Sequence, residues 1–197
     1  MSNAPLKLAV VIGSVRDGRF GPTVAQWFAA QAEQRADFDV DVIDLAEFPL
    51  PLVMPSFGQK PDAKTAEIHA ALGERLGAAD AFVVVTPEYN HTVAPALANT
   101  INWYKAPWEA KPVGLISYGG MGGGLRAAEH LRQIFAELHA ITVRDMLSFH
   151  NAWTSFHKDG EAVSPEGSEA AAKSLLDQLA WWGETLRHAR ATRPYQS

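Results

Sequence analysis

Short continuous runs of hydrophobic residues alternate along the chain with segments in which apolar residues recur at helical spacing. Largely apolar runs at residues 8–12, 81–85 and 112–117, of which the first is rich in valine, are typical of parallel strands that are buried on both faces of a sheet. Residues 38–45 and 141–149 predict two further strands, the first from its partial alternation of apolar and polar positions.

Helical periodicity fills the intervals between these strands. It predicts helices that begin near Pro22 and that cover residues 62–79, 95–104 and 125–139. A last helix is expected after Ser164, a residue suited to the N-cap, with Pro165 in the first helical position. Residues 48–57 are too rich in proline for a helix, and residues 151–167 are polar, so both stretches are expected to be loops.

The alternation of strands and helices predicts a doubly wound α/β fold with a five-stranded parallel sheet and helices on both faces. Right-handed crossovers place the loops that follow the strands at the carboxyl edge, where ligands bind at the switch point in strand order. An anion-binding loop after the first strand favours the flavodoxin-like strand order 2-1-3-4-5. Because no linker or internal repeat interrupts the sequence, residues 1–197 are predicted to form one domain.

The first strand ends in Gly13-Ser14-Val15-Arg16, and a helix follows from Pro22. Backbone N–H groups, the Ser14 hydroxyl and the Arg16 guanidinium are suited to hold an anion, and a helix N-terminus adds partial positive charge. Neither a Walker loop nor G-x-G-x-x-G is present, so a phosphomonoester fits better than a pyrophosphate. Arg19 is either a second cation for this anion or a solvated residue, and the alternative for the whole loop is an ordinary surface turn.

Residues 86–90, Thr-Pro-Glu-Tyr-Asn, follow the third strand, which is expected to stop at Pro87. Tyr89 offers an aromatic face and Asn90 an amide at the edge where a ligand is expected, and backbone N–H groups could reach a planar heterocycle. In the alternative interpretation Pro87 only ends the strand and Glu88 only faces water.

A glycine-rich loop, residues 119–124, follows Ser117 and Tyr118 after the fourth strand. Such a density of glycine allows the backbone to approach a ligand closely and to adopt positive φ. The N–H groups of this loop are candidates to stabilise negative charge that develops on a ligand. The alternative is a flexible hinge.

Composition and charge restrict the possible partners. The chain has 197 residues, 47% hydrophobic and 20% charged, with a net charge of −5. This acidity argues against a nucleic-acid backbone or an anionic membrane as the main ligand. Without cysteine there is no disulfide or thiol nucleophile, and we expect a cytoplasmic protein with no signal peptide. The seven histidines show no metal-ligand spacing, so no metal site is expected.

The three loops also carry motifs of a known family. The motifs are Gly13-Ser14-x-Arg16 with Val24-Ala25, Pro87-Glu88-Tyr89-Asn90 with Pro95, Leu97, Asn99 and Trp103, and Lys111-Pro112-Val113 followed by Ser117-x-Gly119-Gly120-x-Gly122-Gly123. In this ordered set, which covers about residues 6–147, the chain resembles the NAD(P)H-dependent FMN reductases, with their quinone-, azo- and chromate-reducing relatives. It departs from many relatives at Arg19 and Gly21, where they carry Ser and Asn.

The resemblance implies that Ser14 and Arg16 bind the phosphate of FMN, and that residues 87–90 and 117–120 frame the isoalloxazine ring. No side chain is expected to act as an acid or a base. The full set of expected cofactor-binding residues is Ser14, Arg16, Arg19, Gly21, Pro22, Thr23, Pro87, Glu88, Tyr89, Asn90, Ser117, Tyr118, Gly119, Gly120, Gly122 and Gly123.

The function expected from the resemblance is ping-pong hydride transfer from NADPH or NADH to flavin N5 and then to a small oxidant. Quinone, free flavin, an azo compound and a metal oxyanion are all candidate oxidants. The resemblance also implies a homodimer or homotetramer, and the aromatic residues Trp103, Tyr104 and Trp108 belong either to its interface or to the core. The alternatives are a flavodoxin-type FMN electron carrier and an enzyme of the same fold that binds another phosphate.

Overall fold

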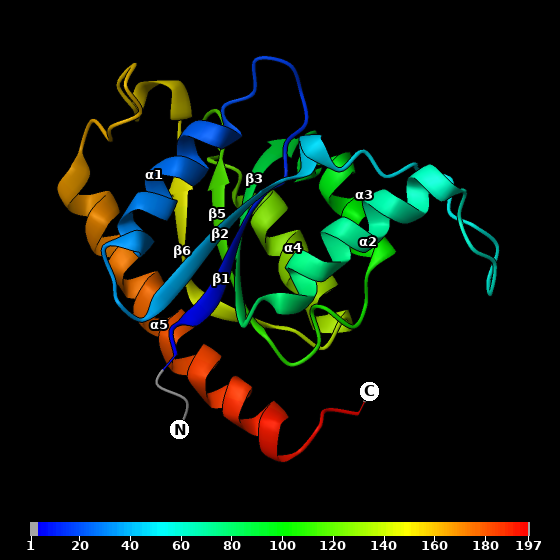
Figure 1. Ribbon diagram of the computed structural model, residues 1–197. Helices are drawn as coiled ribbons and strands as arrows, with labels where there is room; N and C mark the ends of the chain where they lie inside the picture. The colour runs from blue at the N-terminus through cyan, green and yellow to red at the C-terminus, as the bar shows by residue number, and fades with distance from the viewer. Residues whose placement is uncertain (1–3, 197) are drawn as a thin grey trace.

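Five parallel strands form the central sheet of the protein, whose computed structural model describes residues 4–196 (Figure 1). They are β1 (Leu6–Ile12), β2 (Phe38–Asp44), β3 (Ala81–Tyr89), β5 (Pro112–Tyr118) and β6 (Ile141–Phe149). Their order, β2-β1-β3-β5-β6, is the predicted order 2-1-3-4-5 when the five parallel strands are counted along the chain. The predicted single domain includes residues 1–3 and 197, which lie outside the described residues. Residues 1–3 also belong to the N-terminal stretch that was expected to contain no signal peptide.

Helices cover both faces of the sheet, as predicted. On one face lie α1 (Gly21–Glu33) and α5 (Pro165–Thr192), and on the other α2 (Ala63–Ala78), α3 (Pro95–Trp103) and α4 (Leu125–Glu137) (Figure 1). Strand β1 supplies Val10 to the α1/α5 core and Val11 to the opposite core. A strand buried on both faces needs apolar residues at successive positions, which explains the continuous hydrophobic runs in the sequence.

Pro87 does not end the third strand, contrary to the sequence-based expectation. Strand β3 continues to Tyr89 and pairs antiparallel with a two-residue strand, β4 (Thr92–Val93), which was not predicted. The connecting residues Asn90 and His91 have φ of 50° and 66°. Positive φ at both central residues is what a tight type I′ hairpin requires, and asparagine tolerates it well. The strand therefore turns back at this hairpin, two residues beyond the proline.

Two loops differ in detail from their predictions. A 3-10 turn, η1 (Leu45–Glu47), ends the second strand one residue early and precedes the proline-rich loop. The segment expected to be a polar loop contains a second 3-10 turn, η2 (Ala152–Thr154), and α5 begins within it at Pro165. Ser164 occupies the N-cap position as predicted, but its side chain makes no capping hydrogen bond.

The aromatic segment between α3 and β5 belongs largely to the core. Trp108 is fully buried and packs against Phe82 and Phe135, with ring centroids 4.5 and 5.4 Å apart. Tyr104 is also buried, and burial raises its pKa to about 12. Trp103 is half-buried and donates its indole N–H to the carbonyl of Pro51 at 3.1 Å, so it holds the proline-rich loop against α3.

None of the helices in residues 4–196 combines the length and the apolar character needed to cross a membrane.

Candidate functional site

Three loops meet at the carboxyl edge of the sheet, at the top of Figure 1. They follow β1, β3 and β5, which are neighbours in the sheet. The chain leaves β1 toward β2 on one side, while β3 pairs with β1 on the other, so this edge is the switch point in strand order. The amide of Gly13 donates to the carbonyl of Val85 at 2.9 Å and ties the first loop to β3.

Ser14 anchors the loop after β1 and is fully buried. Its hydroxyl oxygen accepts a hydrogen bond of 3.0 Å from the hydroxyl of Tyr118, at the end of β5. Burial raises the pKa of Tyr118 to about 12, so the phenol remains a protonated donor at neutral pH. Because Ser14 accepts from Tyr118, its own hydroxyl hydrogen remains free to donate.

Gly21, the first residue of α1, allows this hydroxyl pair to form. A Cβ atom at this position would stand 2.5 Å from the Ser14 hydroxyl oxygen and 2.9 Å from that of Tyr118. Real Cβ atoms do not come so close to oxygen, so any side chain at Gly21 would force the two loops apart. The sequence placed Gly21 among the cofactor-binding residues; in the structure it lies against the hydroxyl pair beneath the loop.

Arg19, the expected second cation, is held by Asp44 at the end of β2. Its guanidinium makes two hydrogen bonds to that carboxylate, at 2.6 and 2.5 Å, and a third to the carbonyl of Ser14 at 2.6 Å. Its hydrogen bond to Asp44 raises the pKa of Arg19, and the Arg19 guanidinium lowers the pKa of Asp44 against the opposing effect of burial. Sequence reasoning did not include Asp44 in the site. Asp44 lies beside Ile12 in the register of β1 and β2, so the predicted strand order could have placed it next to this loop.

Arg16 differs from Arg19 in having no partner. Its side chain is exposed, and it makes no ion pair or side-chain hydrogen bond with any residue from 4 to 196. Helix α1 begins nearby, and Phe20 at its N-cap provides no side-chain cap for the first-turn amides. Pro22 and Thr23 lie half-buried in that first turn, so an uncapped helix end and a free guanidinium occur in the same loop.

The C-terminal end of β3 contacts the start of α4, which directly follows the glycine-rich loop, through Glu88. This carboxylate accepts the backbone N–H of Arg126, in the first turn of α4, at 3.1 Å and its guanidinium at 2.8 Å. Glu88 therefore caps α4 and does not face water alone. Tyr89 is half-buried against the α2–α4 core, and Asn90 is exposed at the hairpin tip. Arg126 was not among the predicted residues, and no sequence spacing signals its pairing with Glu88.

The glycine-rich loop is fixed at its C-terminal end, so it is not a flexible hinge. The hydroxyl groups of Ser117 and Ser148 both donate to the carbonyl of Gly123, at 2.7 and 2.9 Å. Gly123 and Gly124 adopt φ of 58° and 80°, and side chains at either position would clash with β5 or β6 residues.

Only some of the expected N–H donors in this loop are free. The amide of Gly119 donates to Phe149, and that of Gly123 donates to the carbonyl of Gly120. The amides of Gly120, Met121 and Gly122 have no acceptor among residues 4–196. The row of amides that remain free is therefore shorter than the predicted row of donors, and it is centred on Met121.

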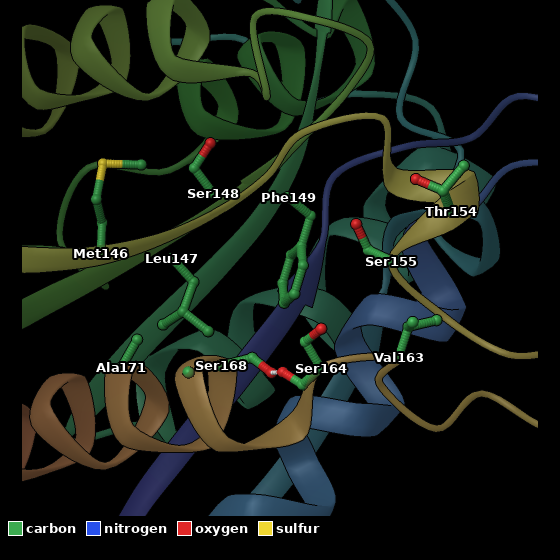
Figure 2. Close-up of a pocket in the computed structure, with 11 residues that line it drawn as sticks. Met146, Leu147, Ser148, Phe149, Thr154, Ser155, Val163, Ser164, Ser168 and Ala171 are labelled. Carbon is green, nitrogen blue, oxygen red and sulfur yellow. Dashed lines mark hydrogen bonds between the residues drawn. The ribbon is translucent and has the colours of Figure 1, made fainter.

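A groove of about 360 Å³ lies between β6 and the first turns of α5 (Figure 2). Its wall carries several hydroxyl groups, and those of Ser148, Thr154, Ser155 and Ser168 already donate to backbone carbonyls. No charged side chain lines the described groove, so its chemistry does not suit a phosphate.

The donor set at the carboxyl edge does suit FMN. The free Arg16 and the uncapped start of α1 offer charge and N–H groups to a phosphate. The free amides at Gly120–Gly122 offer donors to the carbonyls and ring nitrogens of a planar heterocycle. A Cβ atom on Gly120 would be in ordinary van der Waals contact with the indole of Trp153, 3.7 Å away.

Fold and site together define a flavodoxin-like α/β protein built to bind a mononucleotide at the carboxyl edge of its sheet. The chain matches the family described as NADPH-dependent FMN reductase over residues 6–154, and it belongs to that family. Membership makes it an enzyme, an FMN-binding oxidoreductase that uses NAD(P)H.

Relatives with known names agree with this assignment. A quinone reductase of Escherichia coli is 35% identical over 196 residues, which cover 94% of this chain and 97% of that protein. An NAD(P)H-dependent FMN reductase of Schizosaccharomyces pombe is 37% identical over 122 residues, 60% of each chain. Among solved structures, the NAD(P)H:acceptor oxidoreductase FerB of Paracoccus denitrificans superposes with a TM-score of 0.70 at 22% identity, covering 91% of this chain and 98% of FerB.

We predict that Gly21→Ala destabilises the protein by about 1–3 kcal/mol, because the new methyl group separates Ser14 from Tyr118. The matched control is Gly77→Ala in α2, where nothing lies within 4 Å of the Cβ position. Alanine should stabilise that helix by up to about 1 kcal/mol. Urea unfolding monitored by circular dichroism measures both changes, and equal stability of the two variants would contradict the proposed close approach.

Proposed function

We propose that this enzyme reduces a small planar acceptor, with a quinone as the leading candidate, at the expense of NAD(P)H and in ping-pong order. FMN, when bound, supplies the hydride-accepting and hydride-donating chemistry. The observation that carries the proposal is that two sets of free donors lie at one switch point: the Arg16 guanidinium and the amides of Gly120–Gly122. The former suits a phosphate, and the latter suit a flavin ring.

The chain's own residues would hold and orient the cofactor. Arg16 and the amide of Thr23 would bind the phosphate, and the buried Ser14 would act mainly by holding the loop in shape. Arg19 would act in the same indirect way, because Asp44 and the Ser14 carbonyl already occupy its guanidinium. No side chain of the expected set has to donate or remove a proton.

The free amides of the glycine-rich loop would stabilise negative charge on the reduced ring. Gly120, Met121 and Gly122 present N–H groups that are fixed before the reaction, so they need not reorganise when charge develops. The first turn of α4 contributes less than its position suggests, because the carboxylate of Glu88 already caps it. Pro87, Tyr89 and Asn90 would line the opposite side of the ring.

The choice of a quinone rests on the relatives. The similar proteins include the quinone reductase of Escherichia coli and a 2-hydroxy-1,4-benzoquinone reductase of a Burkholderia species, which is 30% identical over 186 residues. A flavodoxin of Pseudomonas aeruginosa superposes with a TM-score of 0.53 at 20% identity, which shows a shared fold. Family membership favours the enzyme over the electron carrier.

The central test is anaerobic mixing of the FMN-loaded protein with NADPH, and separately with NADH, while the flavin absorbance near ~450 nm is recorded. We expect rapid bleaching, and the faster donor identifies the nucleotide. Tight FMN binding without bleaching by either donor would support an electron carrier. Failure to retain FMN would contradict the assignment of the phosphate to the loop after β1, residues 13–20, which we call the phosphate loop.

Arg16→Ala should raise the Kd for FMN about 10- to 100-fold, because it removes a charge-assisted hydrogen bond to the phosphate. The Kd of Arg16→Lys should lie between those of Arg16→Ala and the wild type, because lysine keeps the positive charge but lacks the planar guanidinium. Arg144→Ala is the control, because that side chain is 92% exposed on the edge strand β6. Fluorescence titration of FMN measures each Kd, and an unchanged value for Arg16→Ala would refute the phosphate contact.

We also propose that the enzyme is a homodimer, or a homotetramer made of two dimers. The proline-rich loop exposes Leu52 and Val53 to 78% and 84%, and Phe57 is fully exposed. A groove of about 470 Å³ separates this loop from α3 and reaches Val15 in the phosphate loop. A second copy seated there would cover apolar surface beside the cofactor.

The cytoplasmic location of the protein stays a prediction from its sequence.

The dimer proposal predicts that Phe57→Glu weakens self-association, because burying a charge in an apolar interface is costly. Sedimentation velocity at micromolar concentration should show a dimer or tetramer for the wild type and a larger monomer fraction for the variant. Trp181→Glu, at an exposed apolar position on α5, is the control. A wild type that sediments as a monomer would remove the proposal.

A further inference from the structure

Trp153 is a large exposed side chain at the rim of the site, and the sequence motifs do not include it. Its indole is 65% exposed, and its Cη2 atom lies 3.7 Å from the position that a Cβ atom would take on Gly120. Gly120 begins the row of free amides. The flavin ring that the proposed function assigns to those amides would therefore lie next to the indole, and so would an acceptor that stacks on the flavin.

The fold does not need this indole for its own packing. Ala152, the preceding residue, is buried and joins the α1/α5 core, while Trp153 makes no ring contact and no indole hydrogen bond with residues 4–196. Trp181, which is similarly exposed at 60%, differs because it packs edge-on against Trp182 with centroids 4.8 Å apart. Trp153 is thus an unpartnered aromatic surface at the ligand edge.

The backbone around Trp153 is nevertheless held firmly against the glycine-rich loop. The amides of Asn151 and Ala152 donate to the carbonyls of Gly120 and Gly119, at 2.9 and 3.0 Å. Thr154 closes the 3-10 turn through two bonds of 2.8 Å to the carbonyl of Asn151. These bonds fix the backbone that carries the indole, and ordering a tryptophan side chain on a ligand costs little conformational entropy.

We propose that Trp153 is a specificity-determining residue that stacks against planar aromatic electron acceptors, a proposal that rests on the proposed function. Reductant and oxidant occupy the site in turn, but they are anchored differently. A dinucleotide has phosphates and an adenosine to hold it, whereas a quinone has only its ring. Contact with an indole therefore contributes a larger share of the binding free energy of the quinone.

The test compares Trp153→Ala and Trp153→Phe with Trp181→Ala, all loaded with FMN. For 1,4-naphthoquinone we expect kcat/KM to fall about tenfold in Trp153→Ala through a higher KM, a change of ~1.4 kcal/mol. Trp153→Phe should stay within about threefold of the wild type, because phenylalanine keeps an aromatic face. With ferricyanide, an oxidant that has no planar ring, the kcat/KM of Trp153→Ala should differ from that of the wild type by less than about threefold.

A binding measurement without turnover separates stacking from a general loss of activity. The Kd of 1,4-naphthoquinone for the oxidised, FMN-loaded protein, from flavin difference spectra with no reductant present, should rise about tenfold in Trp153→Ala and stay unchanged in Trp181→Ala. Equal losses with both oxidants, or an unchanged Kd, would overturn the role of Trp153 while leaving the enzyme assignment intact. A wild type whose FMN is not reduced by NAD(P)H would overturn both.

Discussion

The contact between the hydroxyl groups of Tyr118 and Ser14 joins the end of β5 to the loop that follows β1, and the site depends on both. Strands β1 and β5 are not neighbours in the sheet, because β3 lies between them. A side-chain bridge across the intervening strand therefore sets how far apart the phosphate loop and the glycine-rich loop stand. The bridge forms only because Gly21 lets α1 begin directly against it. A change at any of the three residues would shift one loop relative to the other.

Electrostatics divide the two arginines of the phosphate loop into different roles. Arg19 and Asp44 have side chains about one-fifth exposed, at 20% and 19%, so their ion pair is partly shielded from water and fixes β2 to the loop. A guanidinium already bound twice to a carboxylate has little left to offer a phosphate. Arg16 keeps its full charge for a ligand because no described residue competes for it. At the position where many relatives carry serine, Arg19 ties the loop after β1 to the end of β2.

Much of the fold could be read from the sequence because burial on both faces leaves a strong signal. The run around Val10 and Val11 and the order of the parallel strands are examples. The β3–β4 hairpin was missed because Pro87 suggests a strand end, while the turn depends on positive φ at two non-glycine residues. The sequence predicted that the three loops gather at the carboxyl edge, but it did not predict the hydrogen bonds within them. The pairing of Arg19 with Asp44 and of Glu88 with Arg126 depends on side-chain geometry across elements, which no spacing along the chain encodes.

The distribution of donors at the rim bears on which acceptors the proposed site could take. The groups that fit a flavin ring are backbone amides of Gly120, Met121 and Gly122, which no substitution of a side chain removes. Polar side chains nearby, such as Glu88 and Ser148, are engaged in holding the loops. An incoming acceptor therefore meets few polar side chains that must be matched, so shape and apolar contact decide its affinity. Discrimination between acceptors then falls to exposed side chains such as Trp153 and Met121, at 65% and 89% exposure, which can change without disturbing the cofactor frame.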